Sequence, residues 1–491
     1  MGKKKWVSLA MAFLMAGTLA GCADGGGSGK VELRFWASGM QSYTDSLQEL
    51  TEQFNASQDE ITVKFQVRPV DGYADTLQNV LSFSSAPDVF IMGDRYVKKW
   101  ARMNLIAPLS EEFEADKTLE KDEIWPTLVQ RFRYDTEKNI SEEDSELYAI
   151  PIGNNPSVIY YNQTAFEQMN IRVISKDYSD DLPEEEKHGF YRSGEQGTVP
   201  SKDETLVFNN RIPMTWEELV DLSMYLNRSY NAESPTDWGY YCHWWFNFGW
   251  SVGGDCIAYD EEEQVWKFTL GDKTRKTNAE GVELPSMYEA LEFYINMIRT
   301  KDQGGWQLMP TQSDVDVLGN DIYFMTNRVA MLVDVSEKIS VFKADCTFDW
   351  DIAPIPKHKD GVAAGHSQAD GIAIWAKTGH KEAAYRFAQF IASADAQKKL
   401  AEDGLFVPNQ RSVAYNDVYD KTDMVPANSR LLAEVSEYER PGDWTYMPDD
   451  AWINDWADLL NTQVRNNQMS LDEFFETVTD RVNVTLKRYQ Q

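Results

Sequence analysis

The chain has 491 residues, of which 79 are Asp or Glu and 47 are Lys or Arg, so its formal net charge is −32. A field of that sign repels nucleic acid and anionic lipid headgroups, and we therefore expect no nucleic-acid partner. The length exceeds what one ordinary hydrophobic core supports, which predicts two or more lobes. Four cysteines are too few for a disulfide scaffold.

The N-terminal 21 residues have the pattern of a secretory signal. Lysines at positions 3–5 precede an apolar stretch at residues 6–20. The following LAGC, at 19–22, resembles the bacterial lipobox, in which cleavage before Cys22 leaves a thiol that carries diacylglycerol; an ordinary signal cut elsewhere is the alternative. The glycine-rich residues 22–30 predict a flexible tether. We therefore expect an extracytoplasmic protein anchored by lipid to the bacterial cell membrane, without a spanning helix.

The next segments predict a parallel sheet. Residues 31–36 alternate apolar and polar side chains, residues 47–54 have apolar positions at helical spacing, and residues 61–67 alternate again. This succession is typical of a βαβ unit. Residues 86–91 form a short apolar run that indicates a buried parallel strand. Because ligands bind beyond the carboxyl ends of such strands, residues 36–41 and 92–96 are expected near a ligand.

A second lobe is expected to begin near Ile150. Thr215 and Glu218 predict a capping box at the start of a helix, and further helices are predicted near 285–300 and 383–391. Residues 172–210 are rich in charged residues and Ser, which predicts a solvated insertion. The sequence has no Gly-x-x-x-x-Gly-Lys-Ser/Thr motif, so the chain is not expected to bind a nucleotide through a phosphate-binding loop.

The segment YYCHWWFNFGWSVGGDC, residues 240–256, is unusually aromatic and suggests three kinds of site. A metal site is disfavoured, because adjacent residues of an extended segment point to opposite faces and Cys242 and His243 could not both bind easily. A disulfide between Cys242 and Cys256 stays open. The third kind of site is an aromatic platform for a flat ligand, for which three tryptophans compete: Trp244, Trp245 and Trp250.

Several segments in order resemble the extracellular solute-binding proteins of ABC importers, family 1, which includes the maltodextrin-binding proteins. They include APDVFIMGDRYVKKWARMNLIAPL (86–109), LYAIPIGNNPSVIYYNQTAFEQ (147–168), PMTWEELVDLSMYL (213–226), NRVAMLVDVSEK (327–338) and GHSQADGIAIWAK (365–377). The resemblance runs from about residue 31 to the C-terminus. The chain departs from the family pattern in three places: Gln168 replaces a charged residue, Asn327 stands where glycine is usual, and residues 335–337 stand where an aromatic residue is frequent. These departures concern the ligand more than the fold.

The resemblance implies an α/β, two-lobed periplasmic-binding-protein-like fold with two mixed or parallel sheets, flanked by helices and joined by a hinge. The N-terminal lobe would comprise residues 31–150 plus 362–408, and the C-terminal lobe residues 151–361 plus 409–491. Hinge motion is expected near 150–156, 361–369 and 406–412. The implied function is capture of a sugar or oligosaccharide and delivery to the ABC permease subunits, by a monomer without cofactor or catalytic activity.

A carbohydrate binder needs aromatic surfaces for the sugar faces and planar polar groups for the hydroxyls. Position and resemblance together predict the following ligand contacts: Trp36, Asp94, Arg95, Asn154, Trp244, Trp245, Trp250, Asp255, Glu337, Asp370, Arg411 and Trp444. Some have a second interpretation. Trp36 could cap the core, and Asp94 and Arg95 could form a surface ion pair. Asn154 and its neighbour Asn155 could belong to the hinge, and Arg411 could form a hinge ion pair.

Three other functions remain as alternatives. A secreted glycosidase would use paired carboxylates, but in a chain this acidic such runs usually form a solvated face. A metal-uptake protein would need a binding cluster near His243. A sensory lipoprotein would share the fold and pass its ligand to a receptor instead of a permease.

Overall fold

The computed structural model describes residues 30–401, 406–419 and 425–490. The predicted signal, the lipobox and most of the tether lie outside these ranges, so the lipidation of Cys22 stays a prediction. Within the described ranges, no helix has the length and apolar character needed to cross a membrane.

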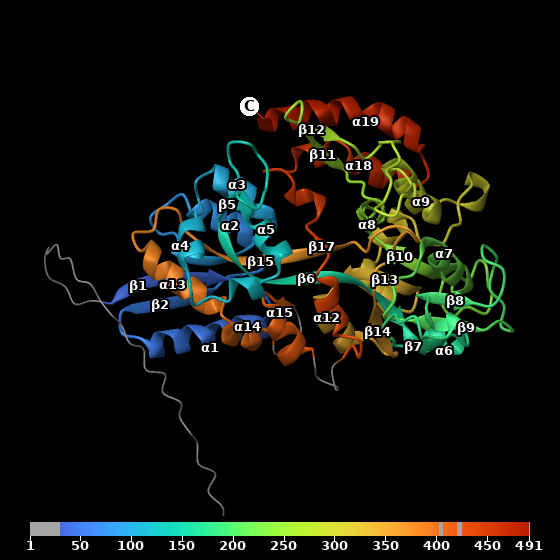
Figure 1. Cartoon of the computed structure of the whole chain (residues 1–491), viewed down its shortest axis with the longest axis horizontal. Helices are drawn as coiled ribbons and strands as arrows, with labels where there is room; N and C mark the ends of the chain where they lie inside the picture. Colours follow the sequence, from blue (N-terminus) through green and yellow to red (C-terminus); the bar gives the residue numbers. More distant parts are fainter. Residues whose placement is uncertain (1–29, 402–405, 420–424, 491) are drawn as a thin grey trace, which may run out of the picture.

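Ten strands form one mixed sheet in the order β10-β13-β6-β15-β3-β1-β2, with β14 and β16 paired to β6 and β17 paired to β15. Their bounds are β1 (Val31–Ala37), β2 (Ile61–Val67), β3 (Val89–Gly93), β6 (Ala149–Asn162), β10 (Trp238–Cys242), β13 (Val329–Val335), β14 (Trp350–Ala353), β15 (Gly365–Ile374), β16 (Val407–Pro408) and β17 (Glu439–Arg440). Strand β1 is parallel to β2 and β3, whereas β15 is antiparallel to both β3 and β6. The long strands β6 and β15 run through the middle of the molecule (Figure 1), so the two expected sheets are continuous.

Helices flank this sheet (Figure 1). Their bounds are α1 (Gln41–Ser57), α2 (Tyr73–Val80), α3 (Val97–Arg102), α4 (Ser110–Ala115), α5 (Pro126–Arg131), α6 (Gln163–Gln168), α7 (Trp216–Tyr225), α8 (Phe246–Ser251), α9 (Met287–Ile298), α10 (Gln312–Asp316), α11 (Asn320–Met325), α12 (Lys338–Asp345), α13 (Lys381–Ile391), α14 (Ala394–Leu400), α15 (Arg411–Val413), α16 (Leu431–Val435), α17 (Ala451–Asn454), α18 (Ala457–Leu459) and α19 (Leu471–Leu486). The predicted βαβ unit is β1-α1-β2. The predicted capping box is present at α7: the Thr215 hydroxyl accepts from the Glu218 amide, and the Glu218 carboxylate accepts from the Thr215 amide.

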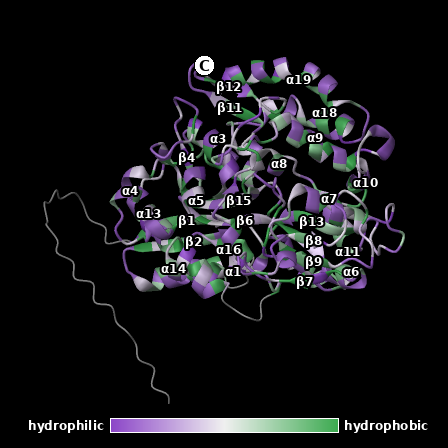
Figure 2. Cartoon of the chain, turned by 45° about the vertical axis from the view of Figure 1, so that its right-hand side comes forward, coloured by the Kyte–Doolittle hydropathy of each residue, from purple (hydrophilic) through white to green (hydrophobic). Residues whose placement is uncertain are grey.

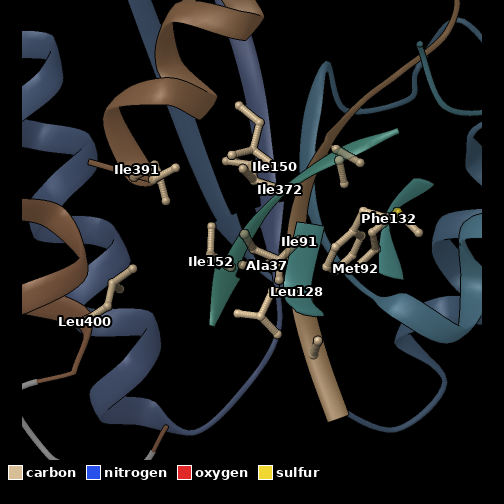
Figure 3. Close-up of a cluster of buried hydrophobic side chains, with 14 of the residues drawn as sticks. Ala37, Ile91, Met92, Leu128, Phe132, Ile150, Ile152, Ile372, Ile391 and Leu400 are labelled. Atoms are coloured by element: carbon tan, nitrogen blue, oxygen red, sulfur yellow. The ribbon is translucent and has the colours of Figure 1, made fainter. Parts of the chain in front are cut away.

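The buried apolar side chains form two clusters. The first surrounds the strands β1, β3, β6 and β15, where Ile91, Ile150 and Ile372 pack together (Figure 3). The second joins α7, α8 and α9 to α19. Figure 2 shows hydrophobic residues concentrated in the central strands and hydrophilic residues on the outer turns of α19. The first cluster also takes in Leu431 and Leu432 of α16. The lobe boundaries stay a prediction.

Residues 172–210 are more structured than their composition predicts. They contain a three-stranded sheet of β7 (Arg172–Ile174), β9 (Leu206–Asn209) and β8 (Phe190–Arg192). The Phe208 ring lies 5.0 Å from the Tyr161 ring and 5.1 Å from the Phe166 ring. A few apolar residues suffice here, because they join the second cluster and need no core of their own.

The departure at Asn327 has a backbone explanation. Asn327 has φ 59°, a left-handed conformation that asparagine adopts more readily than most side chains. Its Oδ1 accepts a hydrogen bond from Asn162 Nδ2 at 2.6 Å. Asparagine can therefore replace the usual glycine before β13 without changing the turn.

Candidate ligand-binding site

A cavity of about 160 Å³ lies beside the long strands β6 and β15. We call it the Asp370 cavity; its polar lining is Ser38, Tyr43, Asn155, Glu337, Gln368 and Asp370. Ser38 follows β1 and Glu337 follows β13, so the cavity lies at the carboxyl ends of a strand from each part of the sheet. This is where ligands of such sheets bind. Of the predicted contacts, the cavity brings together Glu337 and Asp370.

The Asp370 cavity is acidic. The described residues that line it include no lysine or arginine. The Asp370 side chain is exposed to the cavity, yet protein surrounds its carboxyl group, and this burial raises its pKa to about 7 with further contributions from Asp94 and Glu337. Carboxylates in this setting accept hydrogen bonds strongly. The site is therefore suited to hydroxyl or other N–H and O–H donors, and it disfavours anions.

Strand alternation decides which asparagine of the first crossing faces the cavity. Asn155 lines it, and its Oδ1 accepts from Ser336 Oγ at 3.3 Å. Asn154 is buried outside the lining and donates through Nδ2 to Ser436 Oγ at 3.2 Å. Successive strand residues point to opposite faces. The cavity is thus lined by Asn155 and not by the predicted contact Asn154.

An aromatic cluster near β15 contains two of the predicted tryptophans. The His366 ring is buried, with Trp244 4.8 Å and Trp444 4.9 Å away between ring centroids. Burial and, after it, the nearby Arg131 lower the pKa of His366 to about 3, so this ring is neutral at physiological pH. Trp244 and Trp444 are both half-buried. They keep ring surface that a sugar could cover.

The other two tryptophans of the 240–256 segment belong to the core. Trp245 is 6% exposed and packs 5.7 Å from the Trp456 ring. Trp250 is 2% exposed, and the Arg440 guanidinium lies 4.8 Å from its ring centroid. Neither lines the Asp370 cavity. The sequence did not predict which of the three tryptophans is buried. Their spacing is short and irregular, so it does not indicate on which face of the chain each one lies.

A second hollow, of about 310 Å³, lies near α5 and β17. We call it the Arg131 hollow; its lining includes Asp94, Arg131, Trp266, Glu439, Arg440 and Tyr446. Asp94 Oδ2 lies 3.6 Å from Arg131 Nη1, and both side chains are buried. Burial raises the pKa of Asp94 to about 6, and Arg131 opposes that rise. The predicted contact Asp94 therefore faces this hollow and does not line the Asp370 cavity.

Four further predicted contacts are engaged within the protein and line neither cavity nor hollow. Trp36 is 7% exposed, and the Arg68 guanidinium lies 3.6 Å from its ring. Arg95 Nη2 lies 3.3 Å from Asp450 Oδ2. Asp255 Oδ2 accepts from Arg440 at 2.8 Å and from the Tyr446 hydroxyl at 2.9 Å, and Arg411 donates to the Asp122 carbonyl at 2.9 Å. These contacts hold neighbouring segments together.

The disulfide alternative is not realised, because Cys242 and Cys256 are both buried free thiols. Cys242 Sγ donates to the Trp244 carbonyl at 3.0 Å, and burial raises its pKa to about 12. Among the residues that the structure describes, no three His, Cys, Asp or Glu side chains gather in a way that could hold a metal ion.

The structure adds site residues that the sequence did not single out. Tyr43, Gln368 and Phe406 line the Asp370 cavity, and Arg131 and Glu439 line the hollow. A signal for Gln368 existed, since Gln368 and Asp370 are polar positions two residues apart on β15, with Ala369 between them. Arg131 and Glu439 lie more than 300 positions apart in the sequence, and nothing local relates them.

The mixed sheet contains the two long strands β6 and β15, and a cavity lies beside them. This arrangement is typical of the two-lobed class of ligand-binding proteins. The chain belongs to the family of bacterial extracellular solute-binding proteins, whose model matches residues 49–427. The resemblance inferred from the sequence is thereby confirmed, and the family places the protein outside the cytoplasm.

Known proteins of similar sequence and structure support this assignment. A putative binding protein of Brucella abortus (strain 2308) is 21% identical over 435 residues, 88% of each chain. The maltotriose-binding protein of Pyrococcus abyssi is 21% identical over 404 residues, 81% of this chain and 70% of that one. An ABC substrate-binding protein of Listeria monocytogenes, solved in complex with cycloalternan, has a TM-score of 0.65 at 19% identity and covers 94% of this chain and 100% of its own.

Proposed function

We propose that this solute-binding protein captures a carbohydrate between its lobes and delivers it to the permease of an ABC importer. The observation that carries the proposal is the Asp370 cavity, where carboxylate and amide side chains meet at the ends of β1 and β13. Similar proteins named for maltotriose or solved with cycloalternan support a sugar ligand.

The lining of the cavity matches the chemistry of a sugar. Asp370 and Glu337 would accept hydrogen bonds from hydroxyl groups, and Asn155 and Gln368 can both donate and accept. The Tyr43 and Phe406 rings, 5.8 Å apart in an edge-to-face arrangement, offer apolar surface for the C–H faces. Trp244 and Trp444 would stack on a sugar that extends beyond the cavity.

Ligand capture would couple to closure of the lobes. The crossing segments are β6, β15 and β16, and β16 pairs with β6 at Asn154 and Gly153. A ligand that touches both lobes binds the closed state best and shifts the population toward it. The permease would recognise that closed state, and a diacylglycerol on Cys22 would keep the protein at the membrane.

The proposal is tested by thermal-shift and calorimetric screening of the purified chain against neutral sugars, peptides and metal ions. A ligand that binds only the folded state raises Tm by mass action. We expect at least one carbohydrate to raise Tm and to bind with one-to-one stoichiometry, with no new products by chromatography. Turnover of the sugar would indicate a glycosidase, and a response to peptides or metals alone would contradict the proposal.

A further inference from the structure

The Asp370 cavity contains two carboxylates that the protein leaves unpaired. Asp370 lies on β15 and Glu337 directly follows β13, and both line the cavity. Within the described ranges, neither carboxylate forms an ion pair or accepts a hydrogen bond. A carboxylate that protein partly surrounds has lost contacts with water, and here no protein donor replaces them. A ligand would have to supply the missing partner.

The charge around Asp370 is negative. Burial raises its pKa to about 7, and Asp94 and Glu337 add to the rise. The Tyr43 and Tyr73 phenols are also near this carboxyl group: burial raises both of their pKa values, and Asp370 raises them further. Like charges held close together destabilise one another, and a positive charge among them removes that cost. The cavity therefore favours a cation.

Three positive groups of the protein lie near the cavity, and each has another partner. Lys338 Nζ lies 2.8 Å from Asp321 Oδ2, and Arg131 Nη1 lies 3.6 Å from Asp94 Oδ2. The Arg68 guanidinium lies over a tryptophan ring of β1, 3.6 Å from its centroid. None of the three lines the cavity. A positive charge inside it would have to come from the ligand.

Two aromatic rings in the lining also suit a cation. Tyr43 and Phe406 lie edge to face, with ring centroids 5.8 Å apart, and both line the cavity. An ammonium group within about 6 Å of a ring centroid is attracted by the quadrupole of the ring. A metal ion fits less well, because the described part of the chain has no group of three His, Cys, Asp or Glu residues that could hold one. Carboxylates beside aromatic rings indicate an organic ammonium group.

The rest of the lining suits hydroxyl groups. Ser38, Asn155 and Gln368 are neutral polar residues that can both donate and accept hydrogen bonds. Ile152 of β6 and Leu400 of α14 belong to the apolar part of the lining (Figure 3). An amine without hydroxyls would leave the neutral polar residues unpaired. A sugar that carries an amine would pair with both kinds of group.

We propose that the Asp370 cavity selects an amino sugar, whose ammonium group lies between the Asp370 and Glu337 carboxylates and against the two aromatic rings. The sugar hydroxyls would bind the neutral polar residues of the lining. This inference rests on the proposed carbohydrate function and narrows its substrate class to sugars with a free amine. The N-acetylated form of the same sugar is uncharged and would bind less tightly.

The test is calorimetric titration of the full chain at pH 7 with matched sets of sugars. Glucose, galactose, mannose and cellobiose are each compared with the 2-amino and the N-acetylated counterpart, and choline and spermidine represent amines without a sugar.

Two variants, Asp370→Asn and Glu337→Gln, each remove one carboxylate, and Tm is recorded for both. Glu337 is exposed, so Glu337→Gln keeps the test valid if Asp370→Asn does not fold. Asp351→Asn is the matched control. Asp351 is a buried residue of β14 whose pKa burial raises to about 6, and it does not line the cavity.

The readout is the ratio of affinities within a set, because Asp370 would bind the neutral and the charged sugar alike. In the set that binds, we expect the amino sugar to bind about tenfold or more tightly than both neutral forms. Asp370→Asn and Glu337→Gln should each reduce this ratio severalfold, and Asp351→Asn should keep it.

Two results would overturn the amino-sugar inference but leave the carbohydrate function standing: equal affinities within the set that binds, or a ratio that neither cavity variant changes. Binding of choline or spermidine with no response to any sugar would overturn both. Absence of binding by every compound, together with a negative sugar screen, would also overturn both.

Discussion

Trp244 and Trp245 are neighbours in the sequence with opposite environments, and they allow structural and binding roles to be separated. Trp245 is packed against Trp456 in the core, whereas Trp244 is half-buried beside His366. Truncating a buried tryptophan to alanine costs about 3–5 kcal/mol of stability. We predict that loss for Trp245→Ala in urea unfolding.

Trp244→Ala should behave differently. We expect a smaller loss of stability, together with carbohydrate affinity weakened by about 1–2 kcal/mol, because the variant removes stacking surface from the ligand. Unfolding and calorimetric titration of the two variants, measured side by side, check the assignment. If Trp245→Ala unfolds as the wild type does and loses only binding, the roles are reversed.

Two carboxyl groups surrounded by protein make the free energy of unfolding decrease as pH rises toward neutrality. Burial raises the pKa of Asp370 and of Asp443 to about 7, with Asp94 and Asp255 respectively as the next contributions. An unfolded aspartate has a pKa of about 3.9, so the folded chain binds more protons between about pH 4 and 7. The free energy of unfolding should therefore fall as pH rises through that window.

Asp443→Asn tests this sign. Asp443 is 6% exposed, and its replacement by a neutral amide removes one of the protons that the folded state takes up. We predict that Tm of the ligand-free wild type decreases from pH 5 to pH 7.5 and that the decrease is smaller in Asp443→Asn. A Tm that increases over this range in the wild type would contradict the pKa shifts.

At the scale of elements, strand β6 is held to β16 by a close backbone approach at Gly153. Gly153 has φ 153°, and a Cβ there would lie 2.7 Å from the Val407 carbonyl oxygen and 2.3 Å from the Phe406 ring. Both the conformation and the contact disfavour alanine. We predict that Gly153→Ala lowers the free energy of unfolding by about 1–3 kcal/mol. Gly379→Ala is the control, because a Cβ added at Gly379 would have no described atom within 4 Å.

The elements themselves were largely predictable, because their signals are local. The signals are the alternation at residues 31–36 and 61–67 and the Thr215–Glu218 pair, each of which spans fewer than eight residues. The structure has β1, β2 and α7 at these positions. Residues 172–210 escaped prediction because Phe208 gains its burial from Tyr161 and Phe166 in another segment.

The site was predictable only in part, for the same reason. Glu337 and Asp370 follow or lie on elements with clear signals, and both reach the cavity. Asn154 and Asn155 are adjacent in β6 and point to opposite faces, and the sequence does not determine which of the two faces the cavity. The meeting of Arg131 with Asp94 and Glu439 depends on the whole fold and has no local signature.

At the scale of the whole molecule, the predicted lipid anchor is Cys22, which lies outside the described ranges. We predict that Cys22→Ala releases the protein from the membrane fraction of the producing bacterium, because the thiol that would carry diacylglycerol is lost. Fractionation followed by immunoblotting measures this, with Cys346→Ala as the control. Retention of Cys22→Ala in the membrane fraction would exclude Cys22 as the anchor.

The central claim is that a carbohydrate binds in the Asp370 cavity, and calorimetric titration of Asp370→Asn with the sugar that raises Tm most is its most direct test. The titration is done at pH 8, above the Asp370 pKa of about 7, where the carboxylate is ionised and a hydrogen bond to it contributes about 1.5–3 kcal/mol. We predict that Asp370→Asn stays folded and loses about tenfold to hundredfold in affinity. Unchanged affinity for that sugar in the Asp370→Asn variant would contradict the account.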